Sequence, residues 1–354
     1  MSLVFNMVGG GGNGIKLTGI AITTPPKKTV YTTVETFDPG GMVVTATYSN
    51  GAKLTSPSYT FSPAGALTTD DTAVTITYTE LGVTKTATQA ITVIAAPPTA
   101  STSAAAGVSY TSGLSGVSAA DVTAFAELIS NNSGITNATF TVYVDFGNIH
   151  RKISVGDQIT LPLDGTNYAF DVIGFNHDTL TTPTAYGAVT ATGKAGITFQ
   201  MHDVFGTEFA MNYSDTNVAG WRVSKMRTST MVAMKGYLPS DWQAAIKPVN
   251  KASGTGGGSS SGTETVSDDC FLLAETEIFG DVTDLNSVAG EGTQYAYYRA
   301  GNSKKKKQNG SFISWWERSP VSDDEYDFCL VFEYGEAGFK SPLDDYGVAF
   351  GFCA

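Results

Sequence analysis

The chain has 354 residues, of which 15% are charged, and its formal net charge is -12. This length allows about two or three domains that each bury a core, and the abundance of Gly, Thr, Ser and Ala favours a β-rich protein over a helical bundle. The negative charge argues against a nucleic-acid backbone or an anionic membrane as the partner.

The first segment, residues 1–16, is rich in glycine. It carries no basic stretch and no long apolar core, so it does not qualify as a signal peptide, and no apolar run in the chain reaches membrane-spanning length. We therefore expect synthesis in the cytoplasm without a signal peptide, and no membrane insertion. Cys270, Cys329 and Cys353 match no zinc pattern and are interpreted as small buried hydrophobes.

Residues 17–95 are predicted to form a β-sandwich. Apolar and polar residues alternate in 42–48, 73–78 and 83–93, and turns are indicated at Ser49-Asn50-Gly51 and Glu80-Leu81-Gly82. The pattern Ile22-x-x-x-Pro26-x-Lys28-x-x-Tyr31 resembles a group of bacterial Ig-like domains. The resemblance implies a module that spaces or presents other domains.

Residues 96–117 are predicted to be a linker, because Pro97-Pro98 is followed by Thr, Ser and Ala. A helix is expected from Ser118 to about Ser130, with Ser118 as its N-cap, and strands are expected at 139–146 and 168–175. The Gly- and Ser-rich stretch 251–265 is predicted to be a flexible excursion within the last domain, 118–354. The only basic run, Lys304 to Lys307, is interpreted as a solvated loop.

The segment 321–346 is the candidate contact surface. It lies between Trp315-Trp316-Glu317-Arg318-Ser319-Pro320 and Gly347 to Ala354, shows neither helical nor strand periodicity, and mixes aromatic with acidic residues as binding surfaces do. The alternative is an acidic loop region that only solvates a core. The predicted ligand-binding residues are Ser322, Asp323, Asp324, Glu325, Tyr326, Asp327, Phe332, Glu333, Tyr334, Glu336, Phe339, Lys340, Asp344, Asp345 and Tyr346.

From Val155 to the end, the sequence resembles a phage and prophage domain family with a C-type-lectin-like fold, related to the formylglycine-generating enzymes. The match is carried in order by GFNHD (174–178), GITFQ (196–200), GW (220–221), SKMR (224–227), LP (238–239), IKPV (246–249), FLL (271–273), EIFG (277–280), EGTQYAYY (291–298) and WWERSP (315–320). The expected fold is thus mainly β, an Ig-like β-sandwich followed by an α+β, C-type-lectin-like domain.

The ending, with Phe328-Cys329 and Gly347-Val348-Ala349-x-Gly351-Phe352-Cys353, is similar to the variable proteins of diversity-generating retroelements. In these proteins adenine-directed copying errors change chosen codons. The resemblance implies that Cys329, Val331, Gly335 and 347–353 are framework. It implies that the exchangeable contact positions are 321–327, 330, 332–334, 336 and 338–346. The departures are residues that an Asn codon cannot yield through adenine changes alone, namely Glu325, Glu333, Glu336 and Lys340.

A lectin-type scaffold can hold irregular loops on a packed core, so Trp315 and Trp316 are expected to support the surface from beneath and Arg318 to pair with a buried carboxylate. The expected function is that of a virion protein, at the phage tail or surface, that binds a host-cell protein or glycan. Other virion proteins are its further partners, a trimer is the expected self-association, and no cofactor is expected. The alternative is a structural decoration or spacer protein with no specific receptor.

Three other kinds of site were considered besides a contact surface. Formylglycine-generating relatives use paired cysteines with copper, and Cys329 and Cys353 are the candidates here, although both fit the framework pattern and no enzyme activity is expected. His177-Asp178 with His202-Asp203 offer metal-ligand chemistry, but structural histidines are the expectation. Asp323-Asp324 and Asp344-Asp345 offer oxygen ligands for Ca²⁺ at positions expected to vary.

Overall fold

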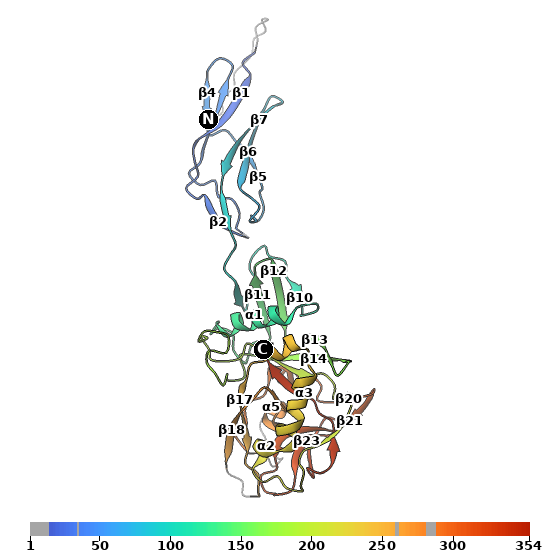
Figure 1. The fold of residues 1–354 in the computed structure, drawn as a ribbon. Coiled ribbons are helices and arrows are strands. Elements are labelled where there is room, and N and C mark those ends of the chain that lie inside the picture. The colour runs from blue at the N-terminus through green and yellow to red at the C-terminus, as the bar shows by residue number, and fades with distance from the viewer. Residues whose placement is uncertain (1–13, 34, 259–261, 281–287) are drawn as a thin grey trace. The chain divides into compact units, whose positions relative to one another are not determined.

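A computed structural model describes residues 14–33, 35–258, 262–280 and 288–354 (Figure 1). The predicted glycine-rich segment, 1–16, lies almost entirely outside these residues. The chain divides into two compact units, Met1–Pro97 with Ala106–Val108 and Pro98–Ala105 with Ser109–Ala354. Within the described ranges, no helix has the length and apolar character needed to cross a bilayer.

The N-terminal unit confirms the predicted Ig-like β-sandwich. Leu67, Val74 and Ile76 lie in its core, where alternate side chains of the strands pack together. The turn at Leu81 and Gly82 has positive φ at both residues, which suits a two-residue hairpin. One sheet contains β1 (Leu17–Thr24), β3 (Val43–Tyr48) and β4 (Lys53–Thr55), another contains β5 (Thr60–Ser62), β6 (Ala73–Glu80) and β7 (Val83–Ala90), and β2 (Val30–Thr32) pairs with β8 (Thr92–Ile94).

A five-stranded sheet forms the centre of the C-terminal unit. Its order is β13 (Gln158–Leu163), β14 (Thr166–Phe175), β15 (Ile197–Met201), β26 (Gly351–Cys353) and β19 (Cys270–Phe271), with antiparallel neighbours. Because the last strand pairs on both sides, the chain end is buried through Ala354. The end of the sequence is therefore part of the core that holds the surface preceding it.

A second sheet lies in the order β10 (Thr111–Ser112), β12 (Ile149–Ser154), β11 (Thr141–Phe146) and β9 (Thr99–Ser101). Two of these strands fall within the range predicted as a linker, 96–117. The composition there is typical of linkers, but the main chain of Thr99–Ser101 pairs with β11 and that of Thr111–Ser112 pairs with β12. Backbone pairing of this kind leaves little trace in composition.

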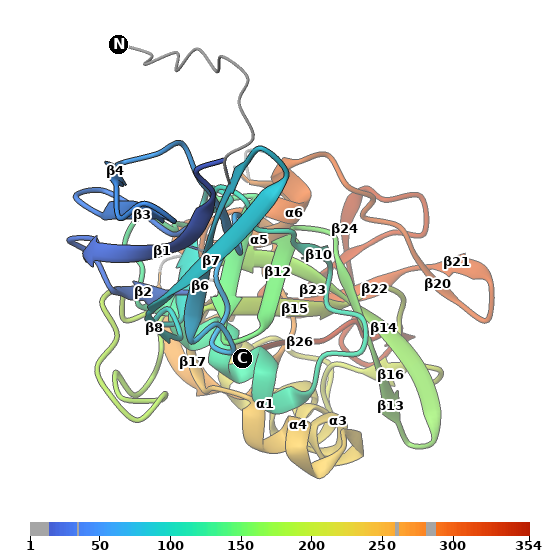
Figure 2. The same ribbon diagram turned by 90° about the horizontal axis from the view of Figure 1, so that it is seen from above.

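Helices cover parts of the C-terminal unit, and α3 and α4 lie close together in Figure 2. The helix predicted from Ser118 to about Ser130 is confirmed as the first helix of this unit, and Ser118 is its N-cap, since its Oγ accepts a hydrogen bond from the Asp121 amide at 3.1 Å. The helices are α1 (Ala119–Ser130), α2 (Gly220–Val223), the π-helix η1 (Met226–Thr230), α3 (Met231–Tyr237), α4 (Ser240–Ala245), α5 (Glu275–Phe279) and α6 (Ala296–Arg299).

Four smaller strand groups complete the C-terminal unit. They are β17 (Val249–Gly254) with β18 (Thr263–Asp268), β16 (Phe209–Ala210) with β25 (Asp345–Tyr346), β20 (Lys306–Gln308) with β21 (Ser311–Ile313), and β22 (Trp315–Pro320) with β23 (Phe328–Val331) and β24 (Ala337–Lys340). The stretch 251–265 lies inside the domain as predicted. Its start is not a flexible excursion, because Lys251, Ser253 and Gly254 are buried on β17.

Candidate functional site

The segment 321–346 contains more regular structure than its sequence indicates. β23 pairs with β22 on one side and β24 on the other, and every residue of β23 is buried. A strand buried on both faces shows no alternation, so its pattern could not be recognised. The strands leave 321–327, 332–336 and 341–344 as loops between fixed backbone segments.

All fifteen predicted contact residues are exposed or partly exposed. Tyr326 and Tyr334 each keep 51% of their surface accessible. The wider set of exchangeable positions needs correction, because Val321, Leu330, Gly338 and Pro342 are buried. At Gly338 an added Cβ would lie 2.0 Å from the Phe332 ring, so this position belongs to the framework.

Charged residues of the different loops lie near enough to affect one another's ionisation. Burial raises the pKa of Asp327, and the neighbouring carboxylates of Asp324, Asp215 and Asp344 raise it further, while Lys340 opposes them. Burial also raises the pKa of Tyr346, with Asp344, Glu333 and Glu208 adding to the effect. We call the exposed side chains of 322–327, 332–336 and 339–346, together with Tyr213 and Asp215, the acidic–aromatic surface.

The loop containing Tyr213 and Asp215 was not predicted from the sequence. Tyr213 is 74% exposed, Ser341 Oγ lies 2.7 Å from Asp215 Oδ1, and the Asn212 amide donates to the Pro342 carbonyl at 3.0 Å. The sequence signal that could have indicated this loop is a tyrosine two residues from an aspartate, outside any periodic pattern. It repeats the aromatic and acidic mixture of 321–346 in a distant segment.

Two tryptophans of β22 lie beneath this surface, as predicted. Trp316 is fully buried, and its ring meets that of Tyr346 edge to face at 5.1 Å. Its indole Nε1 donates to the Phe209 carbonyl at 2.7 Å, and Trp315 Nε1 donates to the Lys304 carbonyl at 2.9 Å. Both indoles are fixed by packing and by a main-chain acceptor, which makes them rigid supports.

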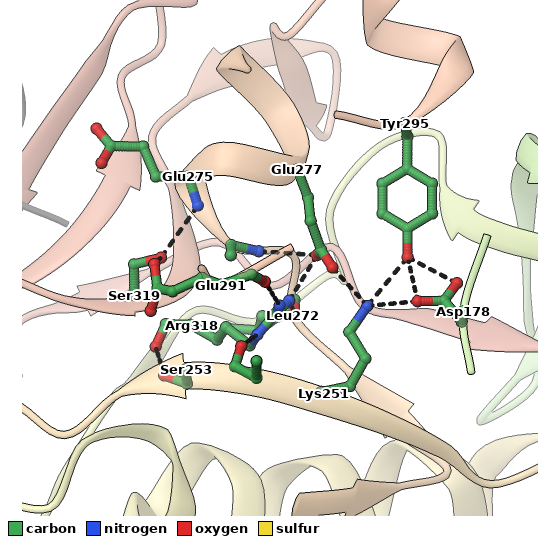
Figure 3. A network of polar contacts seen from close by, with 12 residues as sticks. Asp178, Lys251, Ser253, Leu272, Glu275, Glu277, Glu291, Tyr295, Arg318 and Ser319 are labelled. Atoms are coloured by element: carbon green, nitrogen blue, oxygen red, sulfur yellow. Dashed lines mark hydrogen bonds and ion pairs between the residues drawn. The ribbon is translucent and has the colours of Figure 1, made fainter. Parts of the chain in front are cut away.

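A buried charge network lies deeper in the same unit (Figure 3). Arg318 Nη1 pairs with Glu277 Oε2 at 2.5 Å, which confirms that this arginine pairs with a buried carboxylate. Lys251 Nζ lies 2.7 Å from Asp178 Oδ1, 2.7 Å from Glu277 Oε1 and 3.1 Å from the Tyr295 hydroxyl. The network joins β22, β17, α5 and the segments that follow β14 and precede α6.

The charges of this network compensate each other. Burial by itself would raise the pKa of Asp178, but the Lys251 ammonium holds it well below its ordinary value. Burial likewise opposes ionisation of Glu277, while Arg318 and then Lys251 lower its pKa. A buried carboxylate with such partners stays ionised and hydrogen-bonded, which fixes the segments that carry it.

His177, Asp178 and Glu277 present ligand atoms within 4.8 Å of one another, a spacing that a metal ion could bridge. The Lys251 ammonium contacts both of these carboxylates and supplies the positive charge. His177 stacks on Tyr295 at 3.8 Å between ring centres, and burial lowers its pKa. The lysine ammonium thus occupies the place between the two carboxylates that a metal cation would take, and the cluster is a structural ion-pair network.

The two predicted His-Asp pairs do not converge. His177 and Asp178 line a cavity of about 290 Å³, whereas His202 and Asp203 line another of about 220 Å³. His202 Nδ1 lies 2.9 Å from Asp171 Oδ2. His202 is therefore a hydrogen-bonded histidine as expected, while the buried His177 Nδ1 has no hydrogen-bond partner among the described residues.

The cysteines are free and buried, as predicted. Burial raises the pKa of Cys329 and of Cys353 well above the ordinary value, which disfavours the reactive thiolate. Cys353 Sγ lies 3.4 Å from Thr198 Oγ1. For Cys329, the neighbouring carboxylates of Glu275 and Glu317 add to the effect of burial.

The lysine run is only partly the solvated loop that was predicted. Lys306 is buried on β20, where its Nζ donates to the carbonyls of Met201 and His202, and burial lowers its pKa to about 8. Lys305 and Lys307 are exposed on either side of it, as strand alternation requires. The β20–β21 hairpin projects at the edge of the unit (Figures 1 and 2).

Two family models match parts of the chain. Residues 24–93 match the bacterial Ig-like domain, group 3, which identifies the N-terminal unit as such a domain. Residues 200–350 match a domain of unknown function, DUF6273. This second match includes the whole of 321–346 as well as Lys251, Glu277 and Arg318. No curated protein matches the chain.

Proposed function

We propose that the chain is a non-enzymatic receptor-binding protein of a phage or prophage, of the type varied by diversity-generating retroelements. Its C-type-lectin-like unit displays the acidic–aromatic surface to a host-cell protein or glycan, and its Ig-like domain is a spacer within the virion. The supporting observation is that all fifteen predicted contact residues reach solvent around one connected surface, while Cys329 and Val331 between them are buried.

Exposed and buried side chains have different roles in this unit. Rigid, exposed rings such as Tyr326, Tyr334 and Phe339 provide contact area at low entropic cost, and the surrounding carboxylates select a partner rich in cationic or hydrogen-bond-donating groups. The buried charge network is built from Asp178, Lys251, Glu277, Tyr295 and Arg318, which lie outside this surface. The composition of the surface can therefore change while its support stays constant.

A binding experiment tests the proposal. The labelled chain is applied to a panel of bacterial cells and to a glycan array, beside a Tyr326→Ala/Tyr334→Ala/Phe339→Ala variant. A control variant, Val189→Ala/Val232→Ala, truncates apolar residues elsewhere in the unit that are more exposed than these three aromatic residues. We expect the control to bind as the wild type does and the aromatic variant to lose at least tenfold in affinity. Equal binding by all three proteins would refute the assignment.

The gene neighbourhood separates this function from simple virion decoration. A reverse-transcriptase gene and a near-duplicate of the codons for 315–354, differing at adenines, support recognition. Their absence, together with no saturable binding, supports a decoration or spacer role. Light scattering tests the trimer that is part of the proposal, and a monomeric mass counts against it.

A further inference from the structure

One buried asparagine holds the first loop of the acidic–aromatic surface. The Nδ2 of Asn217 lies within hydrogen-bond distance of three loop carbonyls, those of Val321 at 3.1 Å, Asp324 at 2.7 Å and Asp327 at 2.8 Å, which share its two N–H donors. Its own amide donates to the Glu325 carbonyl at 2.8 Å. Asn217 is 0% exposed, so these bonds form away from solvent competition.

Every bond from Asn217 to the loop ends on a main-chain carbonyl, a group that all amino acids share. The loop is also closed on itself, because the Val321 amide donates to the Asp327 carbonyl at 3.0 Å. Among the loop side chains, Asp324 accepts a bond from the Tyr326 amide, a local turn contact that serine or asparagine can also make. The path of the backbone is thus set largely without the side chains of 322–326.

Two glycines that follow β17, Gly256 and Gly257, lie against Asn217. The Gly257 amide donates to Asn217 Oδ1 at 2.7 Å, which fixes the orientation of the amide group. Gly256 has a φ of +62°, and an added Cβ would lie 2.1 Å from the Asn217 carbonyl oxygen. A glycine is required here because only hydrogen fits between the two main chains.

We propose that Asn217 is the positioning residue of a replaceable recognition loop, in which 322–326 determine specificity and Asn217, Gly256 and Val321 are constant. The role in recognition rests on the proposed function, whereas the main-chain clamp stands on the geometry alone. The chemical consequence is that the side chains of 322–326 can be exchanged together without loss of the loop conformation. The main-chain groups that Asn217 binds are present in every sequence.

The first test compares hydrogen exchange in Asn217→Ala with that in Asn176→Ala. Asn176 is a matched control, since it is also buried and its Nδ2 donates to the carbonyls of Ile129 at 2.9 Å and Ile135 at 2.8 Å, away from the loop. We expect both variants to lower the thermal midpoint. Only Asn217→Ala should raise the exchange of the hydrogen-bonded loop amides, those of Val321 and Tyr326, by at least tenfold. Equal loop exchange in the two variants would overturn the proposal.

The second test does not require Asn217→Ala to fold. In one variant Ser322, Asp323, Glu325 and Tyr326 are changed together, as S322N/D323T/E325S/Y326A, with Asn217 intact. The thermal midpoint should stay within about 2 °C of the wild type and the exchange of the Val321 amide should not change, as expected for surface side chains. A larger loss of stability, or a mobile loop, contradicts the clamp. Neither test uses a ligand, so the clamp and the receptor-binding proposal can fail separately.

Discussion

Replacement of Lys251 by methionine tests whether the buried charge network is the rigid base of the C-terminal unit. The change keeps most of the side-chain volume but removes the cation that contacts Asp178, Glu277 and Tyr295. Two carboxylates are then left with less compensation in a fully buried setting. Arg318 still pairs with Glu277, so Asp178 carries most of the loss.

The expected magnitude follows from the geometry. Hydrogen bonds to charged groups contribute about 1.5–3 kcal/mol each, and removal of one partner from a buried ion pair costs about 3–5 kcal/mol. For a unit of this size, each 1 kcal/mol corresponds to roughly 2–4 °C in the unfolding midpoint. We therefore expect Lys251→Met to lower the midpoint by roughly 6–20 °C at pH 7.

The pH dependence identifies the cause. In the wild type the pKa values of Asp178 and Glu277 are lowered, so their contribution is present above the ordinary carboxylate pKa and is lost as pH falls through the folded values. Without Lys251, burial raises the pKa of Asp178, and the folded state then gains from protonation. The deficit of Lys251→Met relative to the wild type should therefore shrink as pH falls from 7 to 5.

The assay is calorimetric or circular-dichroism melting at several pH values. Lys194→Met is the control, because Lys194 lines the same cavity but donates to Thr179 Oγ1 and the His177 carbonyl, neither of which is charged. Its loss should stay below about 1 kcal/mol. Adding Asp178→Asn to Lys251→Met should restore part of the stability. An equal loss in both lysine variants, or a deficit independent of pH, would refute the reasoning.

Two further predictions concern the surface and the acids beneath it. Tyr326→Ala and Tyr334→Ala should change the free energy of unfolding by less than about 0.5 kcal/mol, whereas Tyr346→Ala, which removes the ring packed on Trp316, should cost about 2–3 kcal/mol in denaturant unfolding. Equal costs at the three positions would contradict the separation of display from support. Burial, together with Glu275 and Glu291, raises the pKa of Glu317 well above its ordinary value, so the wild type loses stability as pH rises from the unfolded pKa toward the folded one. Glu317→Gln should accordingly raise the free energy of unfolding by about 1–2 kcal/mol more at pH 8 than at pH 5, and a gain that does not change with pH would show that Glu317 is compensated.

Local signals in the sequence predicted the local features well. The alternation in 73–78 and the turn at Leu81 and Gly82 indicated a hairpin, and Ser118 with Asp121 marked the start of α1. Lys251 could not be recognised in this way. Its partners Asp178 and Glu277 lie 73 and 26 residues away in the chain, and the surrounding Gly and Ser suggested a flexible segment. A buried ion depends on distant residues, and composition in a short window does not report them.

The buried positions within the contact segment 321–346 were also not predicted from the sequence. Exposure of the acidic and aromatic residues followed from composition, but the burial of Val321, Leu330, Gly338 and Pro342 did not. Leu330 and Gly338 are paired strand residues and the Phe332 ring lies against Gly338, whereas Val321 lies in the loop that Asn217 holds. These positions separate residues that face a partner from residues that hold the backbone. A surface of this kind tolerates exchange only if its stability comes from groups outside it. Asn217, Trp316 and the Lys251 network meet that condition, because each acts on the main chain or within the core.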